Sequence, residues 1–184
     1  MSITTKQGDT GRTRLLFGAG VGKTHPAIHA VGEVDELNAV LGLTRLQLRR
    51  ADLQEIIARA QEDLVAVMGI ISAGAEGAAR YEAQGFRMLT HASLDRVTSE
   101  AAALEAEFPE GFRTWSVPGA AGDPGSAWLE LARCVCRRAE RAVAAACDGG
   151  EFPAALLALA WLNRLSDLFW LAARCEECGV SASS

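Results

Sequence analysis

The densest group of charged side chains lies in residues 132–141, which read Ala-Arg-Cys-Val-Cys-Arg-Arg-Ala-Glu-Arg. In a helix, one face of this stretch would carry Arg133, Arg137, Glu140 and Arg141. Cations spaced at i, i+4 and i+8 repel one another unless an anion neutralises them. Planar guanidinium groups suit a polyphosphate well, but acidic side chains on neighbouring helices would also neutralise them. The stretch alone therefore leaves open both an anionic-ligand site and an interhelical salt-bridge network.

A second polar stretch, at residues 5–13, reads Thr-Lys-Gln-Gly-Asp-Thr-Gly-Arg-Thr. Its glycines allow successive backbone N–H groups to face one concavity, and its hydroxyls and lysine add donors for phosphate oxygens. The same residues would also form an ordinary tight turn. Together with the arginine-rich stretch, however, they favour a phosphate-bearing ligand.

A third stretch, at residues 17–24, reads Phe-Gly-Ala-Gly-Val-Gly-Lys-Thr and resembles a P-loop only in part. The pattern G-x-x-x-x-G-K-S/T requires glycine where Phe17 stands. No alternation of strands and helices follows, so the parallel sheet that supports a P-loop is missing. We therefore reject a P-loop nucleotide hydrolase.

Polar residues also interrupt the apolar stretch near the C-terminus. Asn163, Asp167 and Arg174 fall on one helical face, where a buried amide or carboxylate is costly unless it is paired. The arginines of residues 132–141 are the natural partners, and Asp35 offers another carboxylate. A satisfied salt-bridge network would explain these residues without any ligand.

Composition favours a helical fold. The 184 residues are 49% hydrophobic but only 6% aromatic, which is typical of a helical bundle rather than a sandwich or barrel. Apolar residues recur at helical spacing in five segments, which we expect near residues 26–50, 52 to the glycines at 74–77, 94–108, 126–147 and 152–173. We expect one domain over residues 1–184, formed by an ordered loop (1–26, with an extended piece at 13–17), the bundle (27–174) and a tail (175–184).

Charge and cysteine content limit the functional classes. A net charge of −5 argues against broad attachment to nucleic acid or to a membrane. The first eight residues lack the apolar run of an export signal, and the apolar segment 153–162 is too short to span a bilayer. The five cysteines have no framework spacing and suit a reducing cytoplasm. Cys175 and Cys178 lack the further ligands of a zinc site, so we expect no dedicated metal ligands in the chain.

Five segments, in order, resemble the PduO-type ATP:cob(I)alamin adenosyltransferases, a family of corrinoid adenosyltransferases. The resemblance spans nearly the whole chain and is carried by residues 5–13, Gly32 to Asn38, Val117 to Gly119, residues 132–141 and Leu162 to Asp167. It implies a ferritin-like, up-and-down bundle of five helices that assembles as a homotrimer, with active sites between adjacent subunits. It also implies the reaction, in which the cobalt of cob(I)alamin attacks the 5′ carbon of ATP and yields adenosylcobalamin and triphosphate.

The resemblance further implies roles for individual residues. Arg137, Asp35 and Arg133 would be catalytic, with Asp35 and Arg133 pairing beside the corrin of cobalamin. Trp115 would crowd the lower face of the corrin. With Mg²⁺, ATP would be bound by Thr5, Lys6, Gly8, Asp9, Gly11, Thr13, Lys23, Arg137, Arg138, Glu140, Arg141 and Asn163.

The residues present are compatible with this chemistry. Cobalt(I) is itself the nucleophile, so the protein need supply neither a nucleophile nor a general base. What remains is positioning, exclusion of water and neutralisation of the leaving triphosphate. A corrinoid reductase or an adenosylcobalamin-dependent enzyme would be the expected protein partner. Because Gly20, Glu130 and the loop after Pro118 depart from the family pattern, a non-catalytic relative that binds ATP or cobalamin for delivery or sensing is the alternative.

Overall fold

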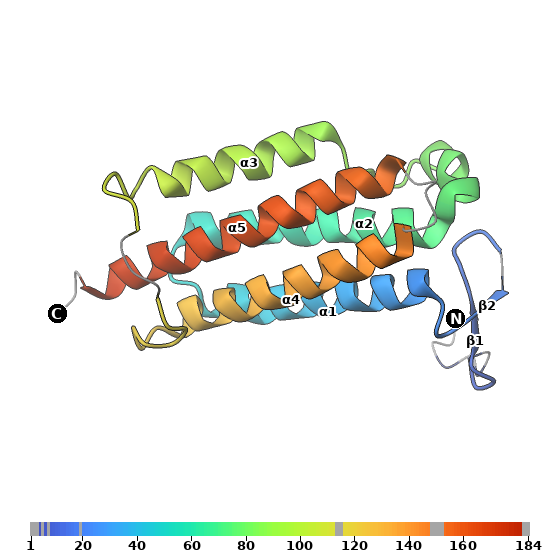
Figure 1. Cartoon of the computed structure of the whole chain (residues 1–184), viewed down its shortest axis with the longest axis horizontal. Coiled ribbons are helices and arrows are strands. Elements are labelled where there is room, and N and C mark those ends of the chain that lie inside the picture. Colours follow the sequence, from blue (N-terminus) through green and yellow to red (C-terminus); the bar gives the residue numbers. More distant parts are fainter. Residues whose placement is uncertain are drawn as a thin grey trace.

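The computed structural model describes residues 4, 6, 8–18, 20–112, 116–147 and 153–181. Within these residues, five helices run up and down in a bundle, and a short hairpin lies at one end (Figure 1). The elements are β1 (Arg12–Arg14), β2 (Gly20–Gly22), α1 (Pro26–Gln47), α2 (Ala51–Ala83), α3 (His91–Glu105), α4 (Pro124–Cys147) and α5 (Pro153–Ser181). The predicted all-α bundle of five helices is confirmed.

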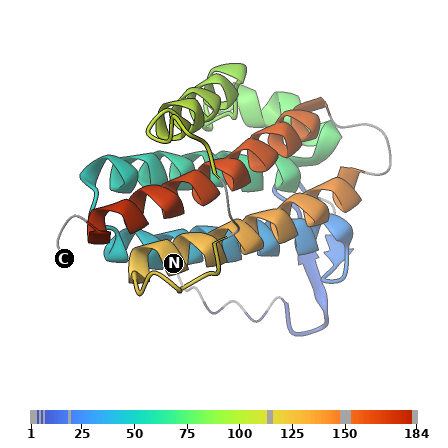
Figure 2. The same cartoon turned by 60° about the vertical axis from the view of Figure 1, so that its left-hand side comes forward.

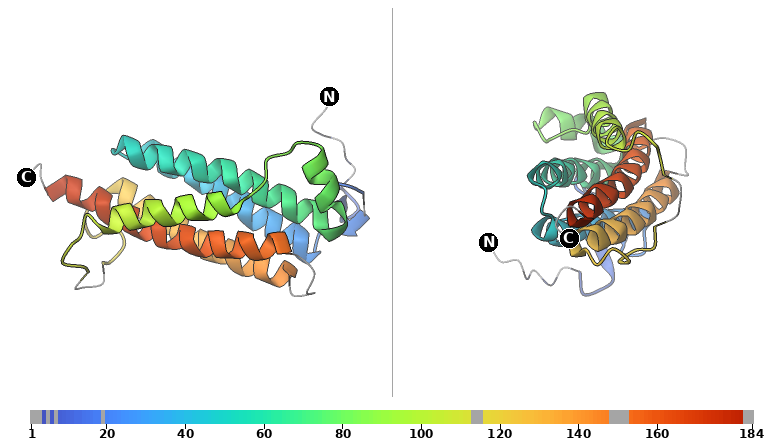
Figure 3. Two further views of the ribbon diagram at one scale, coloured as in Figure 1. Left: turned by 90° about the horizontal axis from the view of Figure 1, so that it is seen from above. Right: turned by 90° about the vertical axis from the view of Figure 1, so that its left-hand side faces the viewer.

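α5 lies at the centre of the bundle. It packs most extensively against α4 and also contacts α3 and α2, while α1 packs against α4 and α2; the end-on view shows this arrangement (Figure 3). Trp161, Leu165, Leu168 and Phe169 of α5 are buried in the core. A helix that is apolar on almost every side requires such neighbours all around it.

α4, the arginine-rich helix, begins where its sequence provides a cap. The Asp123 carboxylate accepts the backbone N–H of Ser126 at 2.6 Å, which satisfies one of the unpaired donors of the first turn. Pro124 occupies the first helical position, where a missing N–H costs nothing. The helix thus starts two residues before the predicted boundary at Ser126.

α2 is longer than predicted because Gly74 bends the helix instead of ending it. Gly74 has a φ of 68°, and helical structure resumes and continues to Ala83. The Tyr81 hydroxyl lies against Gly69, where an added Cβ would be 2.1 Å from its oxygen, and donates to the carbonyl of Arg87 at 3.2 Å. The bent part is thereby held against the first part of the same helix.

α5 also continues past its predicted end at residue 173, as far as Ser181. Cys175 and Glu176 are buried, so these residues belong to the bundle and not to a tail. By length and composition alone, the stretch Ala154–Cys178, with a mean hydropathy of 1.2, could cross a membrane, a test that the core helix of a bundle also meets. This stretch extends well beyond residues 153–162, the segment considered in the sequence. Half of the stretch is buried inside the bundle.

The N-terminal segment forms an antiparallel hairpin in which Thr13 pairs with Val21. A single extended piece was predicted at residues 13–17, but the strand lies slightly earlier and has a partner in β2. The second strand was not predicted, because β2 contains two glycines and glycine has little strand preference. Figure 2 shows the hairpin beyond the start of α1, beside the end of α4.

Candidate functional site

Two arginines of α4 are engaged with carboxylates. Arg133 donates from Nε to Glu130, one turn earlier, at 2.8 Å. Arg138 donates to Glu33 of α1 at 2.5 Å and also pairs with Glu36. Hydrogen bonds to Glu33 and then Glu36 raise the pKa of the Arg138 guanidinium. The salt-bridge interpretation of residues 132–141 is therefore correct for this pair of arginines.

The other two arginines, Arg137 and Arg141, face outward. Both are exposed, and neither makes an ion pair within the part of the chain that the structure describes. They stand one helical turn apart, so their positive charges add on one patch of surface. Because no carboxylate among the described residues pairs with them, the patch is suited to an anionic ligand.

Asn163 and Asp167 of α5 are also exposed, whereas we expected them to be buried and paired with arginines of α4. Asp167 instead accepts from Arg164, within its own helix, at 3.0 Å. Only Arg174, on the same predicted face, is buried. Neighbouring helices cover this face of α5 at Arg174 but not at Asn163 and Asp167, which helical periodicity alone does not reveal.

The seam between α4 and α5 brings several of these groups together. The buried Cys136 thiol donates to the Leu162 carbonyl at 3.3 Å. Its pKa is raised, chiefly by burial, and is further influenced by Glu140, Arg137 and Asp167. The charges of these three residues are thus near enough to the thiol to influence its pKa, and Asn163 lies one turn before Asp167 on α5.

Asp35 is exposed on α1. The pair predicted between Asp35 and Arg133 does not form within the described chain, because Glu130 engages the arginine instead. A carboxylate three residues away on the same helix is an easier partner than one on a neighbouring helix. A pair between Asp35 of one protomer and Arg133 of another stays a prediction.

The N-terminal segment is a compact turn closed by Lys23. The Lys23 N–H donates to the Gly11 carbonyl at 2.9 Å, and Lys23 Nζ lies 3.0 Å from the position of a Cβ on Gly8. Gly11 has a φ of 75°, which glycine adopts without strain. The structure thus gathers the predicted nucleotide-binding residues Lys6, Gly8, Asp9, Gly11, Thr13 and Lys23 in this turn and hairpin.

The hairpin is attached to the bent part of α2. The Leu16 N–H donates to the Ser72 carbonyl at 2.9 Å. Phe17 packs against Gly77, where an added Cβ would lie 2.8 Å from the ring, and the Arg80 guanidinium lies 4.7 Å from the ring centroid. The unexpected continuation of α2 therefore supports the N-terminal turn and hairpin.

The turn and the outward arginines lie toward the same end of the bundle, and within the described residues no hydrogen bond or ion pair joins them. Leu15 and His25 share a cavity of about 160 Å³ with Cys147, the last residue of α4. Arg141 and Arg137 precede Cys147 by roughly 9 and 15 Å along the helix. The hydrogen bonds described for residues 8–23 stay within residues 6–25 or reach Ser72.

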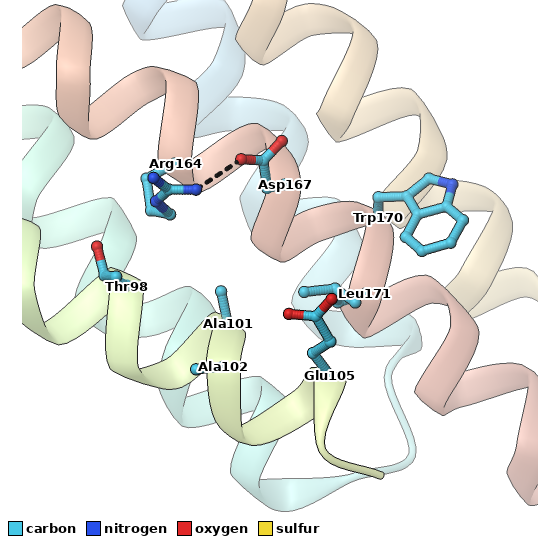
Figure 4. A pocket seen from close by; sticks show the side chains of 8 residues that line it. All are labelled: Thr98, Ala101, Ala102, Glu105, Arg164, Asp167, Trp170 and Leu171. Carbon is cyan, nitrogen blue, oxygen red and sulfur yellow. Dashed lines mark hydrogen bonds and ion pairs between the residues drawn. The ribbon is translucent and has the colours of Figure 1, made fainter. Parts of the chain in front are cut away.

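A larger cavity, of about 460 Å³, opens between α3 and α5 (Figure 4). The Arg164–Asp167 pair borders it. The residues that line it are Thr98, Ala101, Ala102, Glu105, Arg164, Asp167, Trp170 and Leu171. None of the residues predicted to bind ATP or the corrin is among them.

Residues that could bind a metal are sparse in the described part of the chain, which contains no group of three or more His, Cys, Asp or Glu side chains arranged to hold an ion. Mg²⁺ does not require such a cage, since it commonly binds through substrate phosphates and one or two carboxylates. Glu140, on the seam beside Arg137, fits this smaller requirement. Thr5 and Trp115 lie outside the described residues.

A set of buried charged side chains next to Arg133 was not predicted from the sequence. Glu130 and Arg174 are 4% and 6% exposed, and Arg174 Nη2 donates to Glu130 Oε1 at 2.9 Å. The i, i+3 spacing of Glu130 with Arg133 was a visible signal. The contact between α4 and α5 was not, because it depends on how the helices align.

Comparisons with known proteins all point to one family. A sequence model described as cobalamin adenosyltransferase matches residues 3–176. The chain is 35% identical over 179 residues to a cobalamin adenosyltransferase of Cupriavidus metallidurans, covering 94% of this chain and 86% of that protein. It is 33% identical over 175 residues to a corrinoid adenosyltransferase of Bacillus subtilis, covering 95% and 86%.

Solved structures extend the similarity to the fold. The chain superposes on a variant PduO-type ATP:corrinoid adenosyltransferase from Lactobacillus reuteri complexed with cobalamin and ATP, with a TM-score of 0.84, 25% identity and coverage of 98% and 96% of the two chains. A complex of another variant with ATP gives a TM-score of 0.83. The matched segments, the five-helix bundle and these similarities establish that the chain belongs to the cobalamin adenosyltransferase family.

Proposed function

We propose that this protein transfers the 5′-deoxyadenosyl group of ATP to the cobalt of cob(I)alamin, giving adenosylcobalamin and triphosphate. The observation that carries the proposal is the pair of exposed arginines, Arg137 and Arg141, which have no ion pair in the described chain. They lie on the surface that includes Asn163, in a member of the cobalamin adenosyltransferase family. Negative charge builds on the triphosphate as the bond to the 5′ carbon breaks, and preformed cations stabilise it.

The N-terminal turn would hold the nucleotide on its other side. Its backbone N–H groups, Lys6, Lys23 and the hydroxyl of Thr13 provide donors suited to phosphate oxygens. Gly8 and Gly11 allow the ligand to approach the backbone closely. Thr5, Asp9, Arg138 and Glu140 complete the proposed ATP set.

The active site would lie between subunits of a homotrimer. Each chain carries a turn and an arginine surface that no described hydrogen bond or ion pair joins, so a neighbouring protomer would bring the two together. The same arrangement would allow Asp35 of one protomer to meet Arg133 of another beside the corrin. Trp115 would contact the lower corrin face.

Mg²⁺ would accompany ATP and neutralise part of the triphosphate charge. Glu140, whose charge influences the Cys136 thiol next to Arg137, would help to hold it, directly or through water. The five cysteines are free thiols, which supports a location in the reducing cytoplasm. The substrate cobalt must arrive reduced, so a corrinoid reductase and an enzyme that uses adenosylcobalamin are the expected partners.

A single assay tests the proposal. Purified protein, ATP and Mg²⁺ are mixed with chemically reduced cobalamin, and formation of a light-sensitive alkylcobalamin is followed by absorbance. We expect conversion that depends on both ATP and the protein. Binding of ATP and corrinoid with no conversion above the protein-free control would reject catalysis and select a delivery or sensing role.

A further inference from the structure

Arg133 is connected to the interior of the bundle through one carboxylate. Glu130 receives Arg133 Nε on its Oε2 atom at 2.8 Å and Arg174 Nη2 on its Oε1 atom at 2.9 Å. Both oxygens are therefore occupied by guanidinium groups, one from the surface of α4 and one from the core side of α5. Glu130 is 4% exposed and has little freedom to turn elsewhere.

Arg174 is itself held tightly. It is 6% exposed, pairs with Glu177 at 3.0 Å, and lies with its guanidinium carbon 5.4 Å from the ring centroid of Trp170. Glu177 in turn accepts the Ser126 hydroxyl at 2.7 Å. The inner end of the connection is therefore anchored to both α4 and α5.

Stability alone is a poor explanation for this arrangement. Buried ion pairs are costly to desolvate, and apolar side chains of similar size often stabilise a fold at least as well. What the arrangement does provide is orientation, because an arginine side chain otherwise samples many rotamers. Arg133, whose side chain retains 20% exposure, emerges from the pair in a defined direction.

We propose that Glu130, held by Arg174, is a positioning residue that orients Arg133 for its role beside the corrin. The proposal rests on the proposed function, since Arg133 is placed at the corrin by that function. Neither Glu130 nor Arg174 touches substrate in it. Both act through the guanidinium of Arg133.

The test is a double-mutant cycle with the full-length protein. Glu130→Gln keeps the side-chain volume but offers one acceptor oxygen in place of two, so it cannot hold both arginines. The cycle compares wild type, Glu130→Gln, Arg133→Ala and the double variant. Turnover at saturating MgATP, equilibrium binding of the corrinoid followed by its visible absorbance, and MgATP affinity are measured for each.

Glu177→Gln is the matched control. It also removes one carboxylate from Arg174, but Glu177 has no contact with Arg133 in the described chain. Circular dichroism and thermal unfolding report whether each variant is folded. If Glu130→Gln does not fold, Arg174→Lys, which keeps the buried positive charge, takes its place in the cycle.

We expect Glu130→Gln to lower turnover or corrinoid affinity about tenfold or more, since small misplacements in an active site have effects of this size. MgATP affinity should stay unchanged, as should the activity of Glu177→Gln. In the Arg133→Ala background, Glu130→Gln should have no further effect, because its partner is already gone.

Equal losses in both backgrounds, or equal losses from Glu130→Gln and Glu177→Gln, would show a structural role only and overturn the positioning proposal. So would full activity of Glu130→Gln. In each of these cases the wild type still converts cob(I)alamin, and the proposed function stands. If the wild type itself shows no conversion, both proposals fail together.

Discussion

Arg137 and Arg138 are neighbours on α4, but their side chains point in different directions and have different surroundings. Arg138 points toward α1 and is bonded to Glu33 and Glu36. Arg137, the next residue back, points away from the bundle and has no ion pair in the described chain. Consecutive residues of a helix are rotated by about 100°, which is enough to turn Arg138 toward a neighbouring helix and Arg137 toward solvent.

Replacing Arg137 with alanine should reduce kcat/KM about 100-fold, because removal of one preformed donor from a charge-stabilising site has effects of this size. The helix content and the free energy of unfolding should change little, since the side chain is exposed. Arg45→Ala is a suitable control, because Arg45 is an exposed arginine in the last turn of α1. Unchanged turnover in Arg137→Ala would contradict its assignment to the triphosphate.

For single residues, sequence spacing predicted the exposed arginines but not the ion-pair partners of the others. The i, i+4 relation of Arg137 and Arg141 placed them on one surface, and the structure agrees. The partners of Arg138 and Arg174 lie on other helices. Their identity depends on helix alignment, which no local pattern in the sequence encodes.

Among the elements, the bent end of α2 has the clearest consequence for the site. Gly77→Ala would place a Cβ 2.8 Å from the Phe17 ring, so the ring and the hairpin attached to it must shift. We expect the KM for ATP to rise severalfold, with little change in kcat, because the turn is displaced while the arginines stay in place. Steady-state kinetics with varied ATP measure this directly.

The control for that variant is Gly42→Ala in α1. An added Cβ there would lie 3.8 Å from Gln61, which is ordinary contact. Alanine in a helix interior is favoured over glycine by about 1 kcal/mol, so this variant should be more stable and bind ATP normally. An unaltered KM in Gly77→Ala would mean that the hairpin position does not govern nucleotide binding.

The turn between α1 and α2 is fastened by a carboxylate from α5. Glu176 Oε1 accepts the backbone N–H groups of Arg49 and Arg50, each at 3.1 Å. Glu176→Ala leaves these donors and the Arg49 guanidinium without this buried partner, so we expect a loss of about 3 kcal/mol in the free energy of unfolding. Denaturant titration measures it.

Glu107→Ala serves as the comparison, because Glu107 also bonds an arginine of this turn, Arg50, but is 42% exposed. Its loss should cost less than about 1 kcal/mol. The hydrogen bond from Arg50 holds the pKa of Glu107 below its ordinary 4.5. The small contribution of this pair is therefore present above that pH and is lost as the pH falls below the lowered pKa. Similar losses for both variants would contradict the role given to Glu176.

Helical periodicity predicted the number and order of the helices, because each one buries an apolar stripe. It did not predict the length of α2 or α5. In a sequence, a glycine that ends a helix cannot be distinguished from a glycine at a bend. Gly74 is at a bend, because Tyr81 holds the following turn in place. Glu176 read as part of a polar tail, although its partners across the bundle make it a core residue.

For the whole molecule, active sites shared between subunits lead to a further prediction. Lys23→Ala should disable the turn and Arg137→Ala the arginine surface, so each variant alone should be nearly inactive. If sites form between subunits, mixed trimers of the two should regain activity at about a third of the sites, because each mixed trimer has one interface that combines an intact turn with an intact arginine surface. Co-expression with two affinity tags, followed by tandem purification and the conversion assay, measures this.

Doubly tagged Lys23→Ala protein, purified in the same way, controls for effects of mixing. Sizing by light scattering should show a trimer for every sample. Mixed assemblies with no more activity than either parent would place each complete site within one chain and contradict the intersubunit arrangement.

The central position of α5 also affects how the chain folds during its synthesis. Translation delivers α5 after α2, α3 and α4, the three helices that it contacts. Until α5 has left the ribosome, these earlier helices expose the apolar faces that it will cover. The growing chain must therefore be protected from aggregation until this helix has emerged.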